Sequence, residues 1–167
     1  MSKINLMNAE LANRIAAGEV IDRPASVVKE LVENSIDAKS KRIQISISEA
    51  GKKEIRVADD GTGMDRVDAE LCFLRHASSK LKSIYDLRRI TTMGFRGEAL
   101  PSIASISNVE MTTYDGGNAP GTKVTIVPGS EPIIEDSLQR KGTIFTVRNL
   151  FFNTPARLKY LKSDMTE

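Results

Sequence analysis

Cysteine is almost absent from this chain, because Cys72 is the only one in 167 residues. A single cysteine excludes an internal disulfide and is typical of a protein from a reducing compartment. Cys72 lies within the mostly apolar run 71–74, which favours a buried structural thiol over a reactive one. Histidine is equally scarce, with His76 alone. A zinc site made of spaced cysteines and histidines is therefore excluded.

Long apolar runs are missing as well. No run approaches the roughly 18 residues of a membrane-spanning helix, and the N-terminus has no apolar stretch suited to a signal sequence. The net charge of +2 by itself argues for neither a nucleic-acid nor a membrane partner. Hydrophobic residues at 40% and charged residues at 28% are ordinary for a soluble protein. We therefore expect one soluble, intracellular domain with a single core.

Several familiar motifs are also absent. The chain has neither the P-loop nor the glycine fingerprint of a Rossmann domain. A serine triad would need His76 as its base, and no nucleophile elbow accompanies that histidine. Internal repeats and low-complexity tracts are missing too. A bound nucleotide would therefore have to be held in another way.

Apolar periodicity predicts helices early in the chain and strands late in it. Helices are expected over residues 7–17, 24–38, 65–76 and 98–105, with a short basic helix at the end. Strands are expected over residues 43–48, 55–57, 109–115, 122–128 and 143–150. Residues 77–97 lack a long period and are expected to form a long ordered loop. This order favours an α+β fold, a two-layer α/β sandwich with helices on one face of a mixed, mainly antiparallel sheet.

Local patterns make these expectations more specific. Gly18 is expected to end the first helix. The alternation of isoleucine with polar residues over 43–48 predicts a half-buried strand that forms a hairpin with residues 55–57. The apolar stripe of the helix over 65–76 is expected to consist of Val67, Leu71 and Leu74.

The stretch 24–38 has a strongly patterned helical face. Pro24 suits the first turn of a helix. Four polar residues follow at i, i+3, i+4 and i+7 and so share one narrow face: Glu30, Glu33, Asn34 and Asp37. Four others share an opposing face suited to packing on a sheet: Val28, Leu31, Val32 and Ser35. Exposure to solvent is enough to explain a polar stripe when the stripe is considered alone. The alternative is that a positively charged group lies above it and offsets the repulsion between the carboxylates.

A glycine turn follows the strand over 55–57. Asp59 begins the sequence Asp-Asp-Gly-Thr-Gly, which ends at Gly63. A carboxylate at a strand end is suited to accept a hydrogen bond from an exocyclic amino group such as that of adenine. The glycines permit the close backbone approach that a flat base requires. Taken alone, the same sequence also fits an ordinary turn.

Residues 94–100, Gly-Phe-Arg-Gly-Glu-Ala-Leu, precede a helix start. Backbone N–H groups at such a start form an anion site, and the glycines allow them to point at phosphate oxygens. A mobile surface turn is the alternative, and Arg96 would then pair with a local carboxylate. With phosphate bound, Asn34 offers a hard oxygen to Mg²⁺. Glu30, one turn earlier, would orient and deprotonate the water that attacks the γ-phosphate.

Together these motifs resemble those of a known family. Glu30-x-x-x-Asn34, Asp59-x-Gly-x-Gly63, residues 94–100 and Gly142-Thr143 resemble the four ATP-site motifs of the gyrase, heat-shock chaperone, histidine-kinase and MutL ATPase group. Residues 15–20, 23–38, 75–80 and 153–157 resemble signatures of the MutL mismatch-repair family. The resemblance runs from about residue 4 to the end of the chain.

The resemblance implies a Bergerat-type ATP-binding fold with ATP and Mg²⁺ as ligands. It makes Glu30 the general base, Asn34 the magnesium ligand and Asp59 the adenine reader. Gly63 would shape the adenine pocket and Thr143 would support it. A lid over 78–100 would bring to the nucleotide Ser79, Lys80, Gly94, Phe95, Arg96, Gly97, Glu98, Ala99 and Leu100. His76 is interpreted as structural, and Asp60 stands where many relatives have Asn.

The resemblance also implies a domain organisation. Residues 1–22 would form an arm and first helix, 23–153 the ATP-binding domain, and 154–167 the start of a connection to a second domain. In the family that domain supplies a lysine to the γ-phosphate. We therefore interpret the chain as a fragment with weak hydrolysis.

The intact protein would be an ATP-driven switch that forms a homo- or heterodimer. It would couple a MutS-type mismatch-recognition protein to a nuclease and a helicase, with weak, non-specific DNA binding. It would be cytoplasmic if bacterial and nuclear if eukaryotic. The alternative function is a nucleotide- or DNA-binding interaction module without significant turnover, which salt-dependent DNA binding would support.

Overall fold

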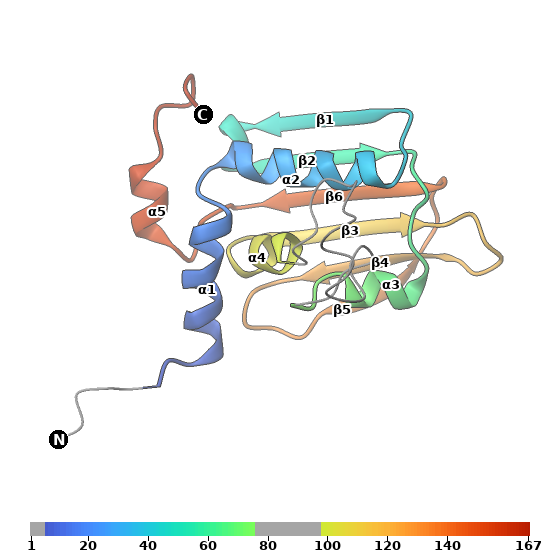
Figure 1. The fold of residues 1–167 in the computed structure, drawn as a ribbon, viewed down its shortest axis with the longest axis horizontal. Coiled ribbons are helices and arrows are strands. Elements are labelled where there is room, and N and C mark those ends of the chain that lie inside the picture. The colour runs from blue at the N-terminus through green and yellow to red at the C-terminus, as the bar shows by residue number, and fades with distance from the viewer. Residues whose placement is uncertain (1–5, 76–97) are drawn as a thin grey trace, which may run out of the picture.

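Helices lie on one face of a six-stranded antiparallel sheet in the computed structural model, which describes residues 6–75 and 98–167 (Figure 1). The strand order is β1-β2-β6-β3-β4-β5, and every pairing among these strands is antiparallel. The strands are β1 (Ile43–Ser48), β2 (Glu54–Asp59), β3 (Asn108–Tyr114), β4 (Gly121–Ile126), β5 (Ile133–Ser137) and β6 (Gly142–Arg148). The α+β sandwich is thus confirmed, with a sheet more uniform than the mixed one expected.

Five α-helices and one 3-10 turn are described. They are α1 (Ala9–Val20), α2 (Pro24–Asp37), α3 (Arg66–Leu71), α4 (Ala99–Ser105), α5 (Pro155–Tyr160) and the turn η1 (Glu49–Gly51). Local chemistry sets their starts: Asn8 Oδ1 accepts from Leu11 N at 2.7 Å, Asp65 Oδ1 accepts from Asp68 N at 2.8 Å, and Pro24 opens α2. None of the described helices is both long and apolar enough to cross a membrane.

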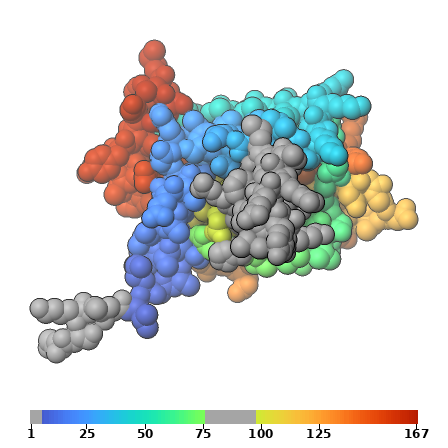
Figure 2. Space-filling view, in the orientation of Figure 1, coloured from blue at the N-terminus to red at the C-terminus, as the bar shows by residue number. Residues whose placement is uncertain are grey.

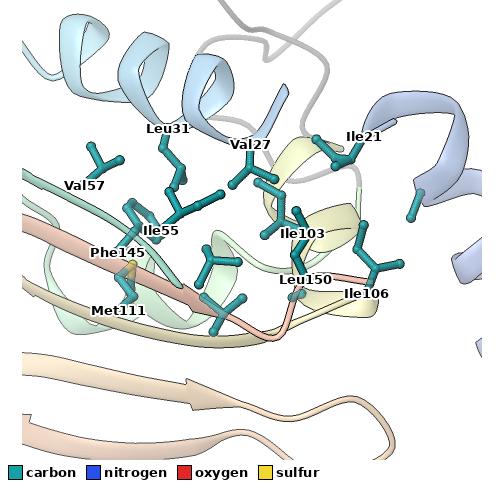
Figure 3. Packing of buried hydrophobic residues seen from close by; sticks show 14 of the residues in the cluster. Ile21, Val27, Leu31, Ile55, Val57, Ile103, Ile106, Met111, Phe145 and Leu150 are labelled. Atoms are coloured by element: carbon teal, nitrogen blue, oxygen red, sulfur yellow. The ribbon is translucent and has the colours of Figure 1, made fainter. Parts of the chain in front are cut away.

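The core lies between α2, α4 and the centre of the sheet. Val27 and Leu31 of α2 meet strand residues such as Ile55, and Ile103 of α4 joins the same cluster (Figure 3). Each of these four side chains is 0–1% exposed. Burial of this kind is the main favourable term in folding. The core therefore fixes α2 over the sheet, and the candidate site residues of α2 with it.

The first helix differs from its expectation. It does not end at Gly18 but continues to Val20, and the following Ile21 N donates to Ala17 O at 2.7 Å. Ile21 is fully buried, so the extra turn carries a core side chain into place. Gly18 O accepts from Arg157 Nη2 of α5 at 3.3 Å. Gly18 therefore does not end the helix. It lies within α1, where it contacts the side chain of Arg157 from α5.

Two burial expectations were wrong. Val67, Leu71 and Leu74 are 63%, 44% and 54% exposed. Val67 and Leu71 share one face of α3, but that face is exposed, and Leu74 lies beyond the end of the helix. Ala69 of that segment is fully buried instead. The strand β1 is also mostly exposed rather than half-buried, since α2 packs on β2 and leaves β1 beyond its cover.

The strand β5 and the single cysteine, Cys72, also bear on the sequence expectations. The strand β5 was missed, because its two isoleucines are followed by Glu135 and Asp136 without alternation. Cys72 caps the end of α3, and its Sγ donates to Ala69 O at 3.3 Å. Burial raises the pKa of Cys72 to about 12, so the thiol stays protonated at neutral pH, in line with a structural role.

Candidate functional site

A polar row crosses the sheet at one end of the core. Asp59 of β2 lies opposite Thr143 of β6, which lies opposite Thr113 of β3, which in turn lies opposite Thr122 of β4. Directly opposed residues point to the same face of a sheet. The next inward row on that face is apolar: Val57, Phe145, Met111 and Val124. The polar row therefore faces the helices where the apolar core ends.

Asp59 is held on both carboxylate oxygens. Its Oδ2 accepts from Ser35 Oγ of α2 at 2.7 Å, and its Oδ1 accepts from Gly61 N at 2.9 Å. Each carboxylate oxygen can accept more than one hydrogen bond. The two contacts fix the orientation of the carboxylate and leave capacity for a further donor. Ser35 was expected only to pack on the sheet, so its bond to Asp59 was missed.

Two threonines of the polar row, Thr113 and Thr143, bond to each other. Thr113 Oγ1 and Thr143 Oγ1 are 2.8 Å apart, and Thr113 Oγ1 also accepts from Met64 N at 3.0 Å. Thr113 is fully buried and Thr143 is 5% exposed, so these bonds avoid the cost of unpaired buried hydroxyls. Thr113 was not singled out from the sequence. Its role depends on a partner 30 residues away in the chain.

Two glycines are required by close backbone contacts. A Cβ on Gly63 (φ +67°) would lie 1.9 Å from Tyr114 O, and one on Gly142 (φ +128°) would lie 2.0 Å from Asp59 O. Both distances are far below any real Cβ contact. The glycine turn after β2 and the start of β6 therefore press directly against neighbouring backbone around Asp59.

The expected hydrolytic residues lie on one flank of α2. Glu30 and Asn34 are both half-buried, and they share a flank at one-turn spacing, beside the buried row of Val27, Leu31 and Ser35. In Figure 1, α2 lies in front of the sheet and runs from left to right. The right-handed sense of a helix then turns the Glu30 and Asn34 flank toward β6. This is the side on which the polar row continues.

Other acidic residues near the site have separate partners. Glu33 Oε1 lies 3.9 Å from Lys29 Nζ on the surface of α2. Asp60 Oδ1 accepts from Lys41 N at 2.7 Å and from Arg42 N at 2.9 Å. These backbone hydrogen bonds, with that from Arg42 the largest cause, hold the pKa of Asp60 below its usual value. Asp60 therefore stabilises the turn before β1, whereas Asp59 beside it faces the helices.

Part of the expected site lies outside the described residues: Ser79, Lys80, Gly94, Phe95, Arg96, Gly97 and the structural candidate His76. Glu98, Ala99 and Leu100 are described, and they form the start of α4. Glu98 Oε2 accepts from Arg75 Nη1 at 2.5 Å, and Arg75 Nε donates to Asn13 Oδ1 of α1 at 2.9 Å. Sequence reasoning missed these contacts of Arg75, although Arg75 opens the 75–80 motif.

Comparison with known proteins gives a consistent result. The family of histidine kinase-, DNA gyrase B- and HSP90-like ATPases matches residues 22–127. The DNA mismatch repair protein MutL of Geobacillus sp. (strain WCH70) is 58% identical over the whole chain, which covers 27% of that protein. MutL of Acidobacterium capsulatum is 55% identical, with 25% of it covered. The chain thus spans about a quarter of the length of these relatives.

Solved structures agree with the sequence relatives. The Aquifex aeolicus MutL ATPase domain complexed with ADP is 33% identical, with a TM-score of 0.65 over 88% of this chain and 50% of the other. The N-terminal domain of a DNA repair protein is 32% identical, with a TM-score of 0.69 over 89% and 42%. The family match spans α2, β2 and the glycine turn, which carry Asn34 and Asp59. The chain therefore belongs to the family of histidine kinase-, DNA gyrase B- and HSP90-like ATPases, and it is similar to MutL mismatch-repair proteins in that family.

Proposed function

We propose that this chain binds ATP at the polar end of the sheet and hydrolyses it with Mg²⁺, as the ATPase region of a mismatch-repair protein. The observation that carries the proposal is the carboxylate of Asp59, fixed by Ser35 and the Gly61 amide at the end of a core strand. The ADP complex of the related Aquifex domain supports an adenine nucleotide as the ligand. Asp59 accepts a hydrogen bond from the adenine amino group in this proposal.

The surroundings of Asp59 suit a flat base. Thr143 lies directly opposite Asp59, and its hydroxyl is held by Thr113. Gly63 brings the backbone after β2 against β3 without an intervening side chain. A base stacked there would meet backbone and short side chains, and Asp59 alone would supply the charge. Recognition of the amino group then selects adenine over a base that carries a carbonyl at that position.

The flank of α2 is suited to the phosphate end of the nucleotide. Among the described residues, no group of three or more His, Cys, Asp or Glu side chains could hold a metal ion. Mg²⁺ commonly takes one or two protein oxygens and draws its remaining ligands from phosphate and water. Asn34 fits that limited role, and bound Mg²⁺ would neutralise phosphate charge. The start of α4, with Glu98, Ala99 and Leu100, is proposed to lie near the phosphates, together with Arg96 and Ser79.

Glu30 is proposed as the general base. It orients the attacking water and takes a proton from it as the water oxygen bonds to the γ-phosphorus. The bond from that phosphorus to the bridging oxygen breaks, and ADP leaves with the electron pair. Glu30 lies one turn from Asn34 on the same flank of α2, so one rigid helix carries both groups. This arrangement limits their relative motion.

For the intact protein we propose an ATP-driven dimerisation switch. It would relay mismatch detection from a MutS-type protein to a nuclease and a helicase, with weak DNA binding. The relatives named above are bacterial, which favours the cytoplasm as its location. The division into an arm (1–22), an ATP-binding domain (23–153) and a connection (154–167) stays a prediction. Arg23, the residue before α2, has its Nη2 3.0 Å from Glu167 Oε2, so residues from the last segment contact the ATP-binding part.

Turnover is tested in a version extended beyond Glu167 to the length of the relatives. Glu30→Ala should keep ATP affinity and lose hydrolysis by about a thousandfold or more, measured as phosphate release. Glu33→Ala is the matched control, because Glu33 shares the polar stripe but pairs with Lys29. Hydrolysis retained in Glu30→Ala would remove this residue as the base. An extended chain that binds ATP without any turnover would favour the binding-module alternative.

The 167-residue chain should bind ATP but hydrolyse it far more slowly than the extended version. The family resemblance implies that a lysine from a second domain contacts the γ-phosphate. Parallel phosphate-release assays at equal ATP saturation measure the difference. Equal rates in the two versions would contradict the proposed need for that lysine.

A further inference from the structure

Two basic turns lie close together at one end of the sheet. One leads from α2 into β1 and the other leads into β6. Both strands begin at the right end of the sheet in Figure 1, and Figure 2 shows the cyan segment after α2 and the orange segment before β6 at the upper right of the molecule. We call their exposed cationic residues the basic edge: Lys39, Lys41, Arg42, Arg140 and Lys141.

The turn after β2 fixes both parts of the basic edge. Asp60 Oδ1 accepts from Lys41 N at 2.7 Å and from Arg42 N at 2.9 Å. On the other side, a Cβ added to Gly142 would lie 3.0 Å from Asp60 Cα, so Lys141 directly precedes a residue packed against this turn. Because β2 lies between β1 and β6, the two basic turns are two strand spacings, or about 10 Å, apart.

The charge of the basic edge is not neutralised by its surroundings. No ion pair joins any of its five side chains to another residue in the described part of the chain. The neighbouring turns, 60–62 and 115–117, contain two acidic residues, Asp60 and Asp115, and Asp115 Oδ1 accepts from Gly117 N at 2.8 Å. Five positive charges thus lie beside two negative ones, in a chain whose net charge is only +2.

The backbone of Lys39 is in a conformation that favours glycine. Its φ is +58°, and its N–H donates to Ile36 O at 2.9 Å where α2 ends. The left-handed conformation costs a residue with a Cβ about 1–2 kcal/mol, and glycine is the residue that usually follows a helix in this way. Backbone preference therefore does not explain the lysine. Its ammonium group is the feature that glycine would lack.

The basic edge is separate from the phosphate end of the proposed ATP site. Ser35 Oγ donates to Asp59 Oδ2, and Glu30 and Asn34 precede that contact on α2. Lys39 follows α2, whose last residue lies about 10 Å along the helix axis from Glu30. A nucleotide that runs from Asp59 toward Glu30 therefore extends away from the basic edge.

Exposed cations spread over about 10 Å suit a ligand with repeated charges better than a single small anion. DNA carries one phosphate per about 3.4 Å of axis on each strand, so the two turns can reach different phosphates. A membrane-binding surface would also need an apolar face. Among residues 138–142, Leu138 is the one large, exposed apolar residue.

We propose that the basic edge binds the phosphate backbone of double-stranded DNA without reading its bases. Contacts of this kind hold and position DNA but carry no sequence information. The choice of DNA rests on the proposed function in mismatch repair, to which this inference adds a site. The site itself does not depend on ATP.

Salt-dependent DNA binding by the 167-residue chain tests the proposal. Fluorescence anisotropy with two labelled duplexes of unrelated sequence should give equal affinities, with a dissociation constant of about 10 µM or tighter at about 50 mM salt. Three to five phosphate contacts should weaken binding at least about thirtyfold between about 50 and 200 mM salt. Wild type without salt-dependent binding at up to about 100 µM protein would overturn the proposal, as would binding to anionic vesicles but not to DNA.

Two double variants test the two parts of the basic edge. Lys41→Gln with Arg42→Gln, and Arg140→Gln with Lys141→Gln, each remove two charges. Each should weaken binding at low salt at least about tenfold and reduce the slope of log affinity against log salt by about two. The same reduction of the slope is expected in the version extended beyond Glu167. An unchanged slope in either version would overturn the proposal.

A control removes two exposed charges at the opposite end of the sheet: Lys53→Gln before β2 with Lys159→Gln on α5. It should leave the slope unchanged, and an equal loss in this control would overturn the proposal, because net charge alone would then explain binding. Circular dichroism verifies that all variants fold. Asp59→Asn should keep DNA binding, so failure of the ATP site and failure of the DNA site are distinguishable.

Discussion

The helix-facing side of the sheet has two contrasting regions. Over most of the face, opposed residues form apolar rows such as Val57, Phe145, Met111 and Val124. Two residues further along each strand, the next row on the same face consists of Asp59, Thr143, Thr113 and Thr122. The strands and their register are shared, so only the side chains differ. The apolar rows stabilise the fold, and the polar row provides hydrogen-bonding groups at its edge.

The polar row is costly unless its groups are paired. Burial of an unpaired hydroxyl costs roughly 1–3 kcal/mol in proteins. Thr113 and Thr143 avoid that cost through each other, and Asp59 through Ser35 and Gly61. Such a network contributes little stability compared with an apolar row of the same volume. We propose that ligand binding accounts for its presence in the fold.

The largest expected effect is a loss of stability when a side chain is added to the closely packed backbone of the polar region. Gly142→Ala should lower the free energy of unfolding by more than about 4 kcal/mol, because the added Cβ would lie 2.0 Å from Asp59 O. Gly129→Ala is the matched control, since Gly129 also has a positive φ (+83°) but nothing within 4 Å of an added Cβ. That change should cost about 1 kcal/mol. Equal losses in urea unfolding would show that strain, and not the contact with Asp59, decides the effect.

A smaller effect on stability is expected when one residue of the polar row or one of the apolar row is replaced. Thr113→Val keeps the shape but removes the acceptor for Met64 N and the partner of Thr143, so it should cost about 1–3 kcal/mol of stability. It should also weaken ATP binding. Met111→Ala, two residues earlier on β3, should cost about 2–5 kcal/mol and leave ATP affinity unchanged in the folded fraction. A loss of affinity in Met111→Ala alone would reverse the roles assigned to the two rows.

The smallest effect concerns pH. The folded-state pKa of Asp60 is lowered, so its contribution to stability is present above the unfolded-state value and is lost as pH falls through the folded value. Because Asp60 is exposed at the surface turn, the effect should be slight. Asp60→Asn should flatten the stability profile below about pH 4 and slightly lower the stability at neutral pH, where the ionised carboxylate of Asp60 contributes. If stability in the acid range depends on pH in the same way in this variant as in wild type, other carboxylates cause the dependence.

The sequence was most informative where a motif is contained in one short segment. The helix over 24–38, the Asp59 turn and the hairpin of β1 and β2 were all predicted from local spacing. Thr113 and Ser35 were missed as partners, because their contacts join strands and helices that are distant in the chain. The exposure of Val67 and of Ile45 was also missed. Periodicity identifies an apolar stripe but does not say whether another element covers it.

The measurement that tests the account most directly is an ATP titration by calorimetry with Mg²⁺ present. Wild type and Asp60→Asn should bind ATP equally, because the Asp60 carboxylate accepts its hydrogen bonds from Lys41 N and Arg42 N in the turn before β1. Asp59→Asn should lose detectable binding, or at least about a hundredfold in affinity, because an amide cannot replace both acceptor oxygens. Thermal unfolding verifies that each variant is folded. Unchanged affinity in a folded Asp59→Asn variant would contradict the assignment of the polar row as the adenine site.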